Sequence, residues 1–300
     1  MCIRDRHTPR GIAEIARSSL QVRSAVRRLE PDLVHANTTR AALLAVLGRR
    51  RGGPPVLAHI RDWAPEGRFP RLVLGLVAAR ADLIVANSAF VAAQFEGMVT
   101  RAPVRVLHNP VDLARFDPAR GDGAAVRREA AVPAEATVLS VVAQLTPWKG
   151  QDDAVRALAG LVAAGQHAVL LLAGSAKFAG EGTQFDNVGF ERRLHELAVE
   201  LGVADRVRFL GERDDVPAIL AASDLLLVPS WREAFGRIVV EGMAMGVAVV
   251  ATESGGPAEI VHPGEGLLLP PRRPDLWAEA LLPLVADPGR RGGSNNPSPG

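Results

Sequence analysis

Short apolar segments alternate with helix-patterned segments along most of the 300-residue chain. Each apolar run ends at a polar residue, a glycine or a proline, which is typical of strands buried in a parallel sheet. Strands that alternate with helices at short spacing predict doubly wound parallel α/β sheets. The expected strands are 32–36, 56–60, 81–86, 104–107, 138–142, 168–173, 207–210, 225–228 and 247–251.

The length of the chain and one irregular segment predict two domains, since 300 residues exceed the usual size of a single core. The segment 116–136 contains Pro118, Gly121 and Gly123 and indicates a boundary. We expect a partial Rossmann-like domain over 1–117, a second Rossmann-like domain over 118–288 and a disordered tail over 289–300. The first domain is expected to be incomplete, because a complete one carries a further strand or two.

The composition narrows the class of protein. Formal net charge is +2, and Lys149 and Lys177 are the only lysines, so the arginine-rich basic character gives little support for a nucleic-acid partner. Cys2 is the single cysteine, which excludes an intramolecular disulfide and a cysteine-based zinc site. It either favours a reducing compartment or leaves the compartment without effect, and we expect the cytoplasm. The uncharged stretch 157–176 is divided at Gly165 into a helix and a strand, so we expect neither a transmembrane helix nor a signal peptide.

The stretch 229–262 carries the strongest signal for chemistry. The apolar run before it stops at Pro229, so Glu233 is expected in a loop at the carboxyl end of a buried strand. A helix is expected from Gly236, and the free amides of its first turn can hold a diphosphate. Glu241 falls inside this helix, and the glycines at 255 and 256 let a ligand approach the backbone closely.

Several motifs occur in order at suitable intervals: Gln-Leu-Thr-Pro-Trp-Lys-Gly at 144–150, Val-Arg-Phe-Leu-Gly at 207–211, the segment 224–230 and a Glu-x7-Glu motif at 233–241. Together they resemble the retaining GT-B glycosyltransferases of family 4. The resemblance covers roughly residues 30–285 and is strongest over 138–262. It implies two Rossmann-like domains that face a cleft, with a nucleotide sugar bound mainly by the second domain. A glycan, lipid or small-molecule acceptor would be held by the first.

The resemblance also implies roles for individual residues. Lys149 would clamp the diphosphate of the donor, Glu233 would lie near the hydroxyls of the transferred sugar, and Glu241 would hold the ribose hydroxyls. The implied nucleotide-sugar-binding set is completed by Gln144, Gly174, Phe235 and Gly236. Transfer with retention would need no catalytic metal and no cofactor besides the donor substrate itself.

Two positions depart from the residues that the family usually has. Gln144 stands where an Arg is usual, and its amide can donate a hydrogen bond but brings no charge. Arg61 stands where a functional His is common, and His59 lies two residues earlier on the same face of the strand. Both His59 and Arg61 are therefore candidate catalytic residues, with a satisfied core histidine as the alternative for His59. The other histidines considered, His35, His108 and His195, are expected to be structural.

Other classes of function find less support. The chain has no Gly-rich loop ending in Gly-Lys-Ser/Thr, no Gly-x-Gly-x-x-Gly after its early strands, and no metal-ligand spacing. Two basic segments are expected, the arginines at 49–51 and the helix over 11–29. They could bind an anionic inner membrane surface peripherally or bind a phosphorylated acceptor.

Two alternatives stand beside an active glycosyltransferase. One is a non-catalytic or fragmentary nucleotide-sugar-binding protein, because the chain lacks the Gly-rich turn that usually opens the first domain and the carboxyl-terminal helix that usually crosses back to it. The other is a nucleotide-sugar epimerase of the same architecture.

Overall fold

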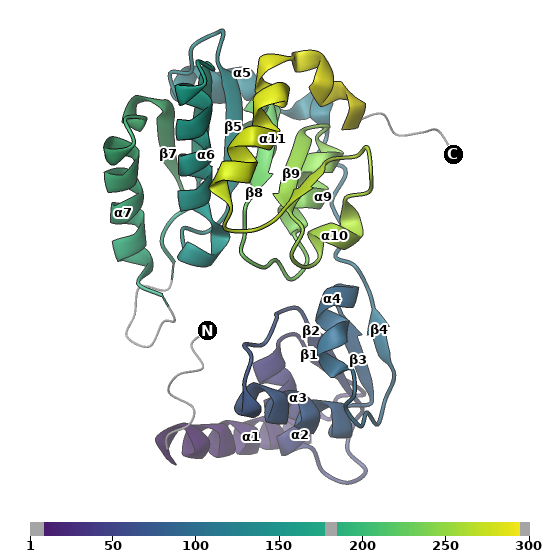
Figure 1. Cartoon of the computed structure of the whole chain (residues 1–300). Coiled ribbons are helices and arrows are strands. Elements are labelled where there is room, and N and C mark those ends of the chain that lie inside the picture. Colours follow the sequence, from purple (N-terminus) through teal and green to yellow (C-terminus); the bar gives the residue numbers. More distant parts are fainter. Residues whose placement is uncertain (1–8, 178–184, 295–300) are drawn as a thin grey trace. The chain divides into compact units, whose positions relative to one another are not determined.

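The computed structural model describes residues 9–177 and 185–294, which fold into two α/β units (Figure 1). One unit comprises Met1–Asn109 and the other Pro110–Gly300. The second unit thus begins before the boundary placed at 117/118 from the sequence. The reason is that Phe116, only 6% exposed, packs in the core of the second unit with Leu226 and Val228.

The first unit is a four-stranded parallel sheet in the order β1-β2-β3-β4. Its strands are β1 (Val34–Ala36), β2 (Val56–Ile60), β3 (Leu83–Ala86) and β4 (Val104–Val106). Its helices are α1 (Pro9–Leu29), α2 (Thr39–Gly48), α3 (Arg68–Arg80) and the short α4 (Ala89–Ala92), which runs into a 3₁₀ turn, η2 (Ala93–Phe95).

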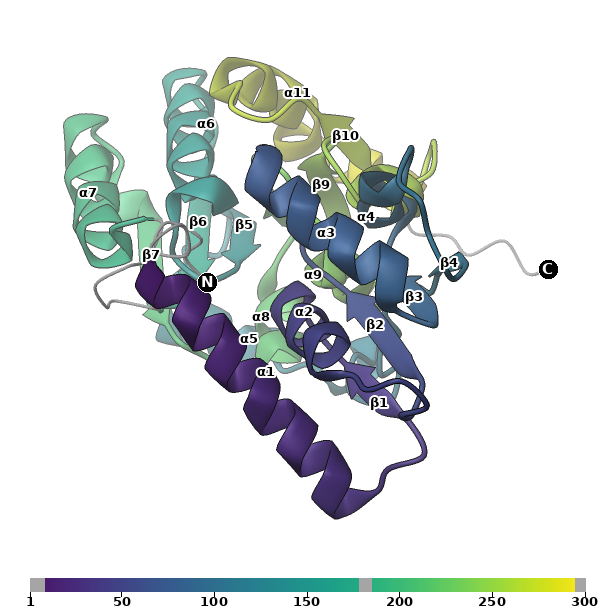
Figure 2. The same ribbon diagram turned by 90° about the horizontal axis from the view of Figure 1, so that it is seen from below.

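Helix α1 packs along α2, as Figure 2 shows. A Cβ atom on Gly48 would lie 2.6 Å from the carbonyl oxygen of Ser19, so the backbones of the two helices approach each other closely at this point. The hydroxyl of Thr38 accepts a hydrogen bond from the amide of Ala41 and caps the start of α2.

The second unit is a six-stranded parallel sheet in the order β10-β9-β8-β5-β6-β7. Its strands are β5 (Thr137–Val142), β6 (Ala168–Ala173), β7 (Val207–Gly211), β8 (Leu225–Val228), β9 (Ala248–Thr252) and β10 (Leu267–Leu269). Its helices are α5 (Gly123–Glu129), α6 (Gln151–Ala163), α7 (Asn187–Glu200), α8 (Val216–Ala222), α9 (Arg237–Ala244), α10 (Pro257–Ile260) and α11 (Pro274–Ala286), with 3₁₀ turns η3 (Pro118–Arg120), η4 (Pro147–Lys149), η5 (Ala204–Arg206) and η6 (Pro288–Ser294).

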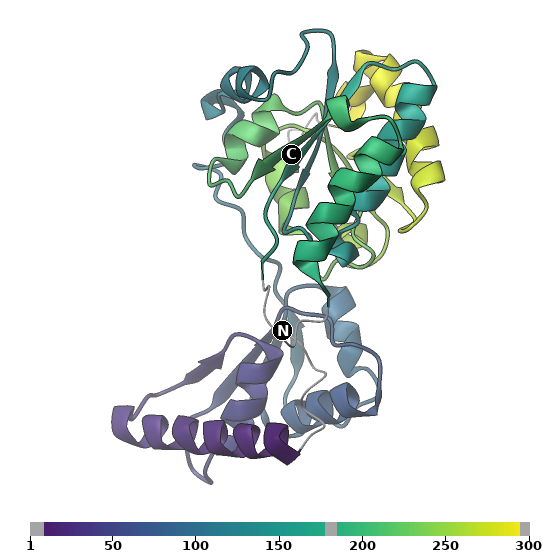
Figure 3. The same ribbon diagram turned by 90° about the vertical axis from the view of Figure 1, so that its left-hand side faces the viewer.

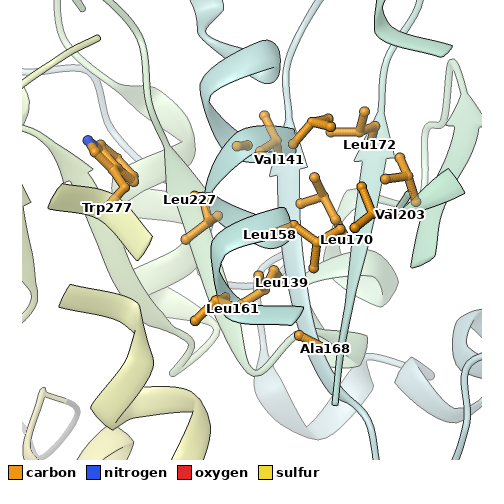
Figure 4. Packing of buried hydrophobic residues seen from close by; sticks show 14 of the residues in the cluster. Leu139, Val141, Leu158, Leu161, Ala168, Leu170, Leu172, Val203, Leu227 and Trp277 are labelled. Atoms are coloured by element: carbon orange, nitrogen blue, oxygen red, sulfur yellow. The ribbon is translucent and has the colours of Figure 1, made fainter. Parts of the chain in front are cut away.

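Both faces of this sheet are covered by helices, which explains why its strands are apolar on both sides (Figures 1 and 3). Helices α6, α7 and α11 contribute to one core with residues of β5, β6, β8 and β9, and part of this core is drawn in Figure 4. Helices α5, α8 and α9 pack on the other face. The sheet is therefore a rigid platform for the loops that leave its strand ends.

Every strand expected from the sequence is present, with ends shifted by a residue or two. Two elements near the carboxyl end, β10 and α11, were not predicted. Trp277 of α11 is 1% exposed and its indole donates a hydrogen bond to the carbonyl of Pro270. The chain also remains folded beyond Gly289, where a disordered tail was expected, because Arg291 donates to Asp224, to the hydroxyl of Thr137 and to the Leu284 carbonyl. Residues 295–300 lie outside the described residues.

No helix in the described ranges combines the length and the apolar character that crossing a bilayer requires.

Candidate functional site

The strand order of the second unit reverses between two central strands, β5 and β8. From β5 the chain moves to β6 and β7 on one side, and from β8 it moves to β9 and β10 on the other. In open α/β sheets a ligand binds outside the carboxyl ends of the strands at such a reversal. The loops that follow β5 and β8 carry most of the residues singled out from the sequence.

These two loops are in direct backbone contact. Gly150, at the end of the first loop, has a φ of +71°, and a Cβ atom there would lie 2.1 Å from the carbonyl oxygen of Pro229 in the second. The amide of Trp231 donates a hydrogen bond of 2.9 Å to the carbonyl of Trp148. The sequence therefore needs a glycine at 150 to bring the side chains of both loops together.

Lys149 and Glu233 form a nearly buried ion pair at this contact. Nζ of Lys149 lies 2.5 Å from Oε2 of Glu233, and the two side chains are 18% and 11% exposed. The hydroxyl of Ser230 donates a second hydrogen bond of 3.1 Å to the same carboxylate oxygen. The ammonium also lies 4.2 Å from the centroid of the Trp148 ring, within the range of a cation–π interaction.

The backbone of Glu233 is fixed by the loop that follows β9. Its amide donates to the carbonyl of Ser254 at 3.0 Å, and its carbonyl accepts from the amide of Gly256 at 2.9 Å. Gly255 has a φ of +111°, and a Cβ atom there would lie 2.0 Å from the Glu233 carbonyl oxygen. The glycines at 255 and 256 thus bring a third loop into contact with the pair.

Helix α9 begins directly after Gly236, whose φ of +89° only glycine adopts without strain. Phe235 is buried, with 3% of its surface exposed. No side chain caps the helix start, and the amide of Val239 donates to the carbonyl of Gly236 at 2.9 Å. The amides of Arg237 and Ile238 are thus the ones that a ligand or solvent can reach.

Glu241 lies one turn into α9, beside Arg237. The Nε atom of Arg237 is 3.6 Å from Oε1 of Glu241, whose side chain is 15% exposed. Burial raises the pKa of the Glu241 carboxyl, and the charges of Arg237 and Arg115 offset part of that rise. No hydrogen bond or ion pair in the described chain joins Glu241 to the Lys149–Glu233 pair.

Gln144 and Gly174 lie where the loops leave β5 and β6, and both make contacts with the backbone of other segments. The side-chain amide of Gln144 donates to the carbonyl of Lys177 at 3.2 Å, and the backbone carbonyl of Gln144 accepts from the side chain of Gln151 at 2.8 Å. Gly174, with a φ of +147°, holds the end of β6 so close to the β5 loop that a Cβ atom would lie 1.9 Å from the Ala143 carbonyl oxygen.

In the first unit, His59 of β2 stacks on His35 of β1. Their ring centroids are 5.6 Å apart and the rings are 11° from parallel. Nε2 of His59 is buried and has no hydrogen-bond partner among the described residues. Burial lowers the pKa of His59, and the charges of Arg61 and His35 lower it further. Arg61 is exposed at the end of β2, where its carbonyl accepts from the side-chain amide of Asn87 at 3.3 Å.

The sequence reasoning missed three residues that the structure brings to these sites. Ser230 and Trp148 contact the Lys149–Glu233 pair, and both are close to it in sequence, which is a usable signal. His35 was assigned a structural role, yet it is exposed and stacked on His59. That contact depends on the register of β1 on β2, which no pattern in the sequence reveals.

Two α/β units with parallel sheets, one of them holding a buried Lys–Glu pair at its switch point, define a protein of the GT-B architecture. Residues 124–294 match the family model described as Glycosyl transferases group 1, and residues 3–115 match the model described as Glycosyltransferase Family 4. The chain belongs to the glycosyl transferases group 1 family. The resemblance stated from the sequence is confirmed for both family and fold.

Among curated relatives, the chain is 34% identical over 291 residues to a D-inositol 3-phosphate glycosyltransferase of Actinosynnema mirum, with 89% of this chain and 68% of the relative covered. It is 33% identical over 289 residues to the protein of the same name from Salinispora tropica, covering 87% of this chain and 58% of the relative. The chain thus spans little more than half the length of that relative.

Among solved structures, the chain is similar to Anabaena HepE (Alr3699) in complex with UDP and glucose, at 30% identity and a TM-score of 0.80, with 91% of this chain and 74% of that chain covered. Sucrose-phosphate synthase of Thermosynechococcus elongatus shares the fold, at 24% identity and a TM-score of 0.80, with coverages of 93% and 71%.

Proposed function

We propose that this chain carries the donor-binding part of a retaining glycosyltransferase, which moves a hexose from a nucleotide-diphosphate sugar to an acceptor. The observation that carries the proposal is the nearly buried Lys149–Glu233 pair at the switch point of the second unit. A cation and a carboxylate held side by side suit a ligand that presents both phosphate oxygens and sugar hydroxyls.

Lys149 is the proposed clamp for the leaving diphosphate. Its ammonium has three N–H donors, so it can keep one bond to Glu233 and offer the others to phosphate oxygens. The start of α9 is a second source of positive potential, because the amides of Arg237 and Ile238 have no partner within the helix. Fixed donors of this kind stabilise the charge that develops as the sugar leaves.

Glu233 and Glu241 are the proposed partners of donor hydroxyls. Glu233 would accept from hydroxyls of the transferred sugar, and Glu241 from the ribose, with the amides of Phe235 and Gly236 between them. We propose that Gln144 and Gly174 support the donor through the backbone that they position, since the Gln144 side chain already donates to Lys177.

On the acceptor side we propose His59 and Arg61, which stand at the carboxyl end of β2 in the first unit. The unpartnered Nε2 of His59 supports a role in which the ring meets a ligand hydroxyl. Arg61, exposed and always charged, would pair with an anionic group of the acceptor.

The relatives suggest which substrates to test first. HepE was crystallised with UDP and glucose, and the curated relatives are named for D-inositol 3-phosphate. We therefore propose a UDP-hexose as donor and a small phosphorylated acceptor, ahead of a glycan or lipid. The single cysteine supports a reaction in the cytoplasm.

The deciding experiment measures turnover of UDP-, GDP- and ADP-sugars with and without D-inositol 3-phosphate, together with the thermal midpoint in each nucleotide. A ligand that binds only the folded state raises the midpoint. Transfer that keeps the anomeric configuration and survives EDTA supports the proposal. A raised midpoint without turnover favours a non-catalytic or fragmentary binder, and conversion of the free nucleotide sugar to its epimer favours an epimerase. No shift with any nucleotide sugar overturns all three.

A further inference from the structure

Arginines from two segments that are distant in sequence line one cavity of the first unit. The cavity has a volume of about 350 Å³, and Arg23 and Arg27 of α1 face it together with Arg49, Arg50 and Arg51 of the loop after α2. Glu30 is the only acidic residue in its lining. The sequence showed two basic segments, and the fold brings them to a single site.

Most of these arginines form no ion pair with another described residue. Arg49 pairs with Asp82 at 2.5 Å and donates to the carbonyl of Arg80. The side chains of Arg23, Arg27, Arg50 and Arg51 make no hydrogen bond or ion pair with the described part of the chain. Unpaired guanidinium groups around a concave site favour an anion, above all a phosphate that can accept paired N–H donors.

Part of the cavity lining is apolar, which argues against a site for a bare inorganic ion. It is formed by aliphatic side chains of α1, α2 and the first residues of β1 and β2: Val22, Val26, Ala45, Val34 and Val56. Close by in the sequence, Leu29 and Leu33 are 69% and 49% exposed. Exposed leucines beside a cluster of arginines are typical of a surface that meets lipid headgroups.

The cavity also lies away from the proposed acceptor residues. Val56 begins β2 and Ile60 ends it, so the two ends of the strand are about 13 Å apart at about 3.3 Å per residue. An occupant of the cavity would leave the end of β2 with His59 and Arg61 accessible.

We propose that this cavity and the leucines beside it dock the first unit on an anionic bilayer, with a phospholipid headgroup phosphate among the arginines. The attraction is electrostatic and weakens with salt, since exposed charges are screened over about 10 Å at 0.1 M ionic strength. This surface is independent of the donor site, so its test needs no turnover.

The test is co-sedimentation of the full chain with vesicles of phosphatidylcholine alone and of an equal mixture with phosphatidylglycerol. Binding to the anionic vesicles only, lost at high salt, is expected. The double variant Arg27→Gln/Arg50→Gln removes one unpaired arginine from each segment and should weaken vesicle binding roughly 30-fold, because each basic residue near an anionic surface contributes about 1 kcal/mol.

The matched control is Arg71→Gln/Arg105→Gln, which removes the same charge from two exposed arginines elsewhere in the first unit. It should retain binding within about threefold. Equal losses in the two double variants would show a response to net charge alone and overturn the proposal, as would equal binding to uncharged vesicles or no binding at all. A soluble phosphate as the occupant is tested with glycerol 3-phosphate: if it raises the thermal midpoint of the chain, if Arg27→Gln/Arg50→Gln abolishes that rise, and if anionic vesicles do not sediment the chain, the cavity is a soluble-phosphate site and the proposal is overturned. Leu29→Ser should weaken vesicle binding and leave any effect of glycerol 3-phosphate unchanged.

Discussion

Nζ of Lys149 lies 2.5 Å from Oε2 of Glu233 and 4.2 Å from the centroid of the Trp148 ring, so one ammonium is held by a carboxylate and an aromatic face together. The loops that carry these side chains follow β5 and β8, the neighbouring strands at which the sheet order reverses. The chain also contains a second Lys–Glu pair, Lys177–Glu212 at 2.5 Å, whose side chains are 49% and 58% exposed. The two pairs allow a matched comparison of the same chemistry in different surroundings.

We expect Lys149→Ala to lower donor hydrolysis or transfer by about 10²- to 10³-fold, the usual effect of losing one preorganised donor to a developing charge. Its effect on ground-state binding of the donor should be smaller. Lys177→Ala should change both by less than about twofold, because an exposed ion pair contributes little. The measurements are single-turnover rates and calorimetric titration with UDP-glucose. Equal losses of rate and affinity in Lys149→Ala would contradict a leaving-group role.

We expect Trp148 to affect nucleotide binding by holding the ammonium group of Lys149 in place. Trp148→Leu removes the aromatic face and is expected to weaken UDP binding about fivefold, the effect of roughly 1 kcal/mol of cation–π attraction. Trp148→Phe keeps a ring and should retain most of the affinity. Binding of uridine, which has no phosphate, should be the same in both variants. A parallel loss for uridine and UDP would show that the ring supports the loop and not the ammonium.

Glu241→Ala is expected to weaken nucleotide binding by more than about tenfold, because a ribose hydroxyl pair would lose both carboxylate acceptors. The raised pKa of Glu241 adds a pH dependence: as the pH falls the carboxyl is protonated earlier than an ordinary glutamate, so affinity should fall on acidification, and Glu241→Gln should remove this dependence. Glu200→Ala, at an exposed position of α7, is the control. An unchanged dissociation constant in Glu241→Ala would remove the ribose assignment.

Gly150 and Gly202 have nearly the same backbone conformation, with φ of +71° and +68°, but different surroundings. A Cβ atom on Gly202 would have no other atom within 4 Å, so Gly202→Ala should cost only the left-handed strain of about 1–2 kcal/mol. Gly150→Ala adds a clash with Pro229 and should cost about 3–5 kcal/mol. Denaturant unfolding measures both. Similar costs would mean that the two loops separate easily.

Asp153, at the start of α6, should make stability depend on pH. Burial, and next the charge of Asp152, raise the pKa of Asp153 to about 6, while Arg156 and Arg272 act in the opposite direction. Between about pH 3.8 and 6 the folded state keeps a proton on Asp153 that the unfolded state releases. The stability that Asp153 contributes is therefore fully present below pH 3.8 and is lost as the pH rises through about 6.

Asp153→Asn should therefore raise the thermal midpoint above about pH 6 and flatten its dependence between about pH 4 and 6. Asp205→Asn, at an exposed position, should leave the profile as it is in the parent chain. If the two variants have the same profile, Asp153 does not carry the proton.

The strands, the two-unit organisation and the positions of Lys149 and Glu233 at strand ends were all predictable, because apolar runs and turn residues are local signals. The contact between the two side chains was not, since it joins residues 84 positions apart and depends on β5 lying next to β8. Helix α11 was missed for a local reason: prolines at 270, 271 and 274 precede it or open it, and Pro283 lies inside it. The helix forms nevertheless, because Trp277 packs in the core and this burial outweighs the unfavourable prolines.

The Lys149–Glu233 pair supplies each of its members with a built-in counterion. A free phosphate or nucleotide would have to compete with Glu233 for Lys149 and would leave a nearly buried carboxylate without its cation, at a cost in free energy. A sugar nucleotide brings hydroxyl groups for the carboxylate as well as phosphates for the ammonium. Under the proposed function the pair would thus discriminate against the many small anions of a cell in favour of a ligand that carries both groups at once.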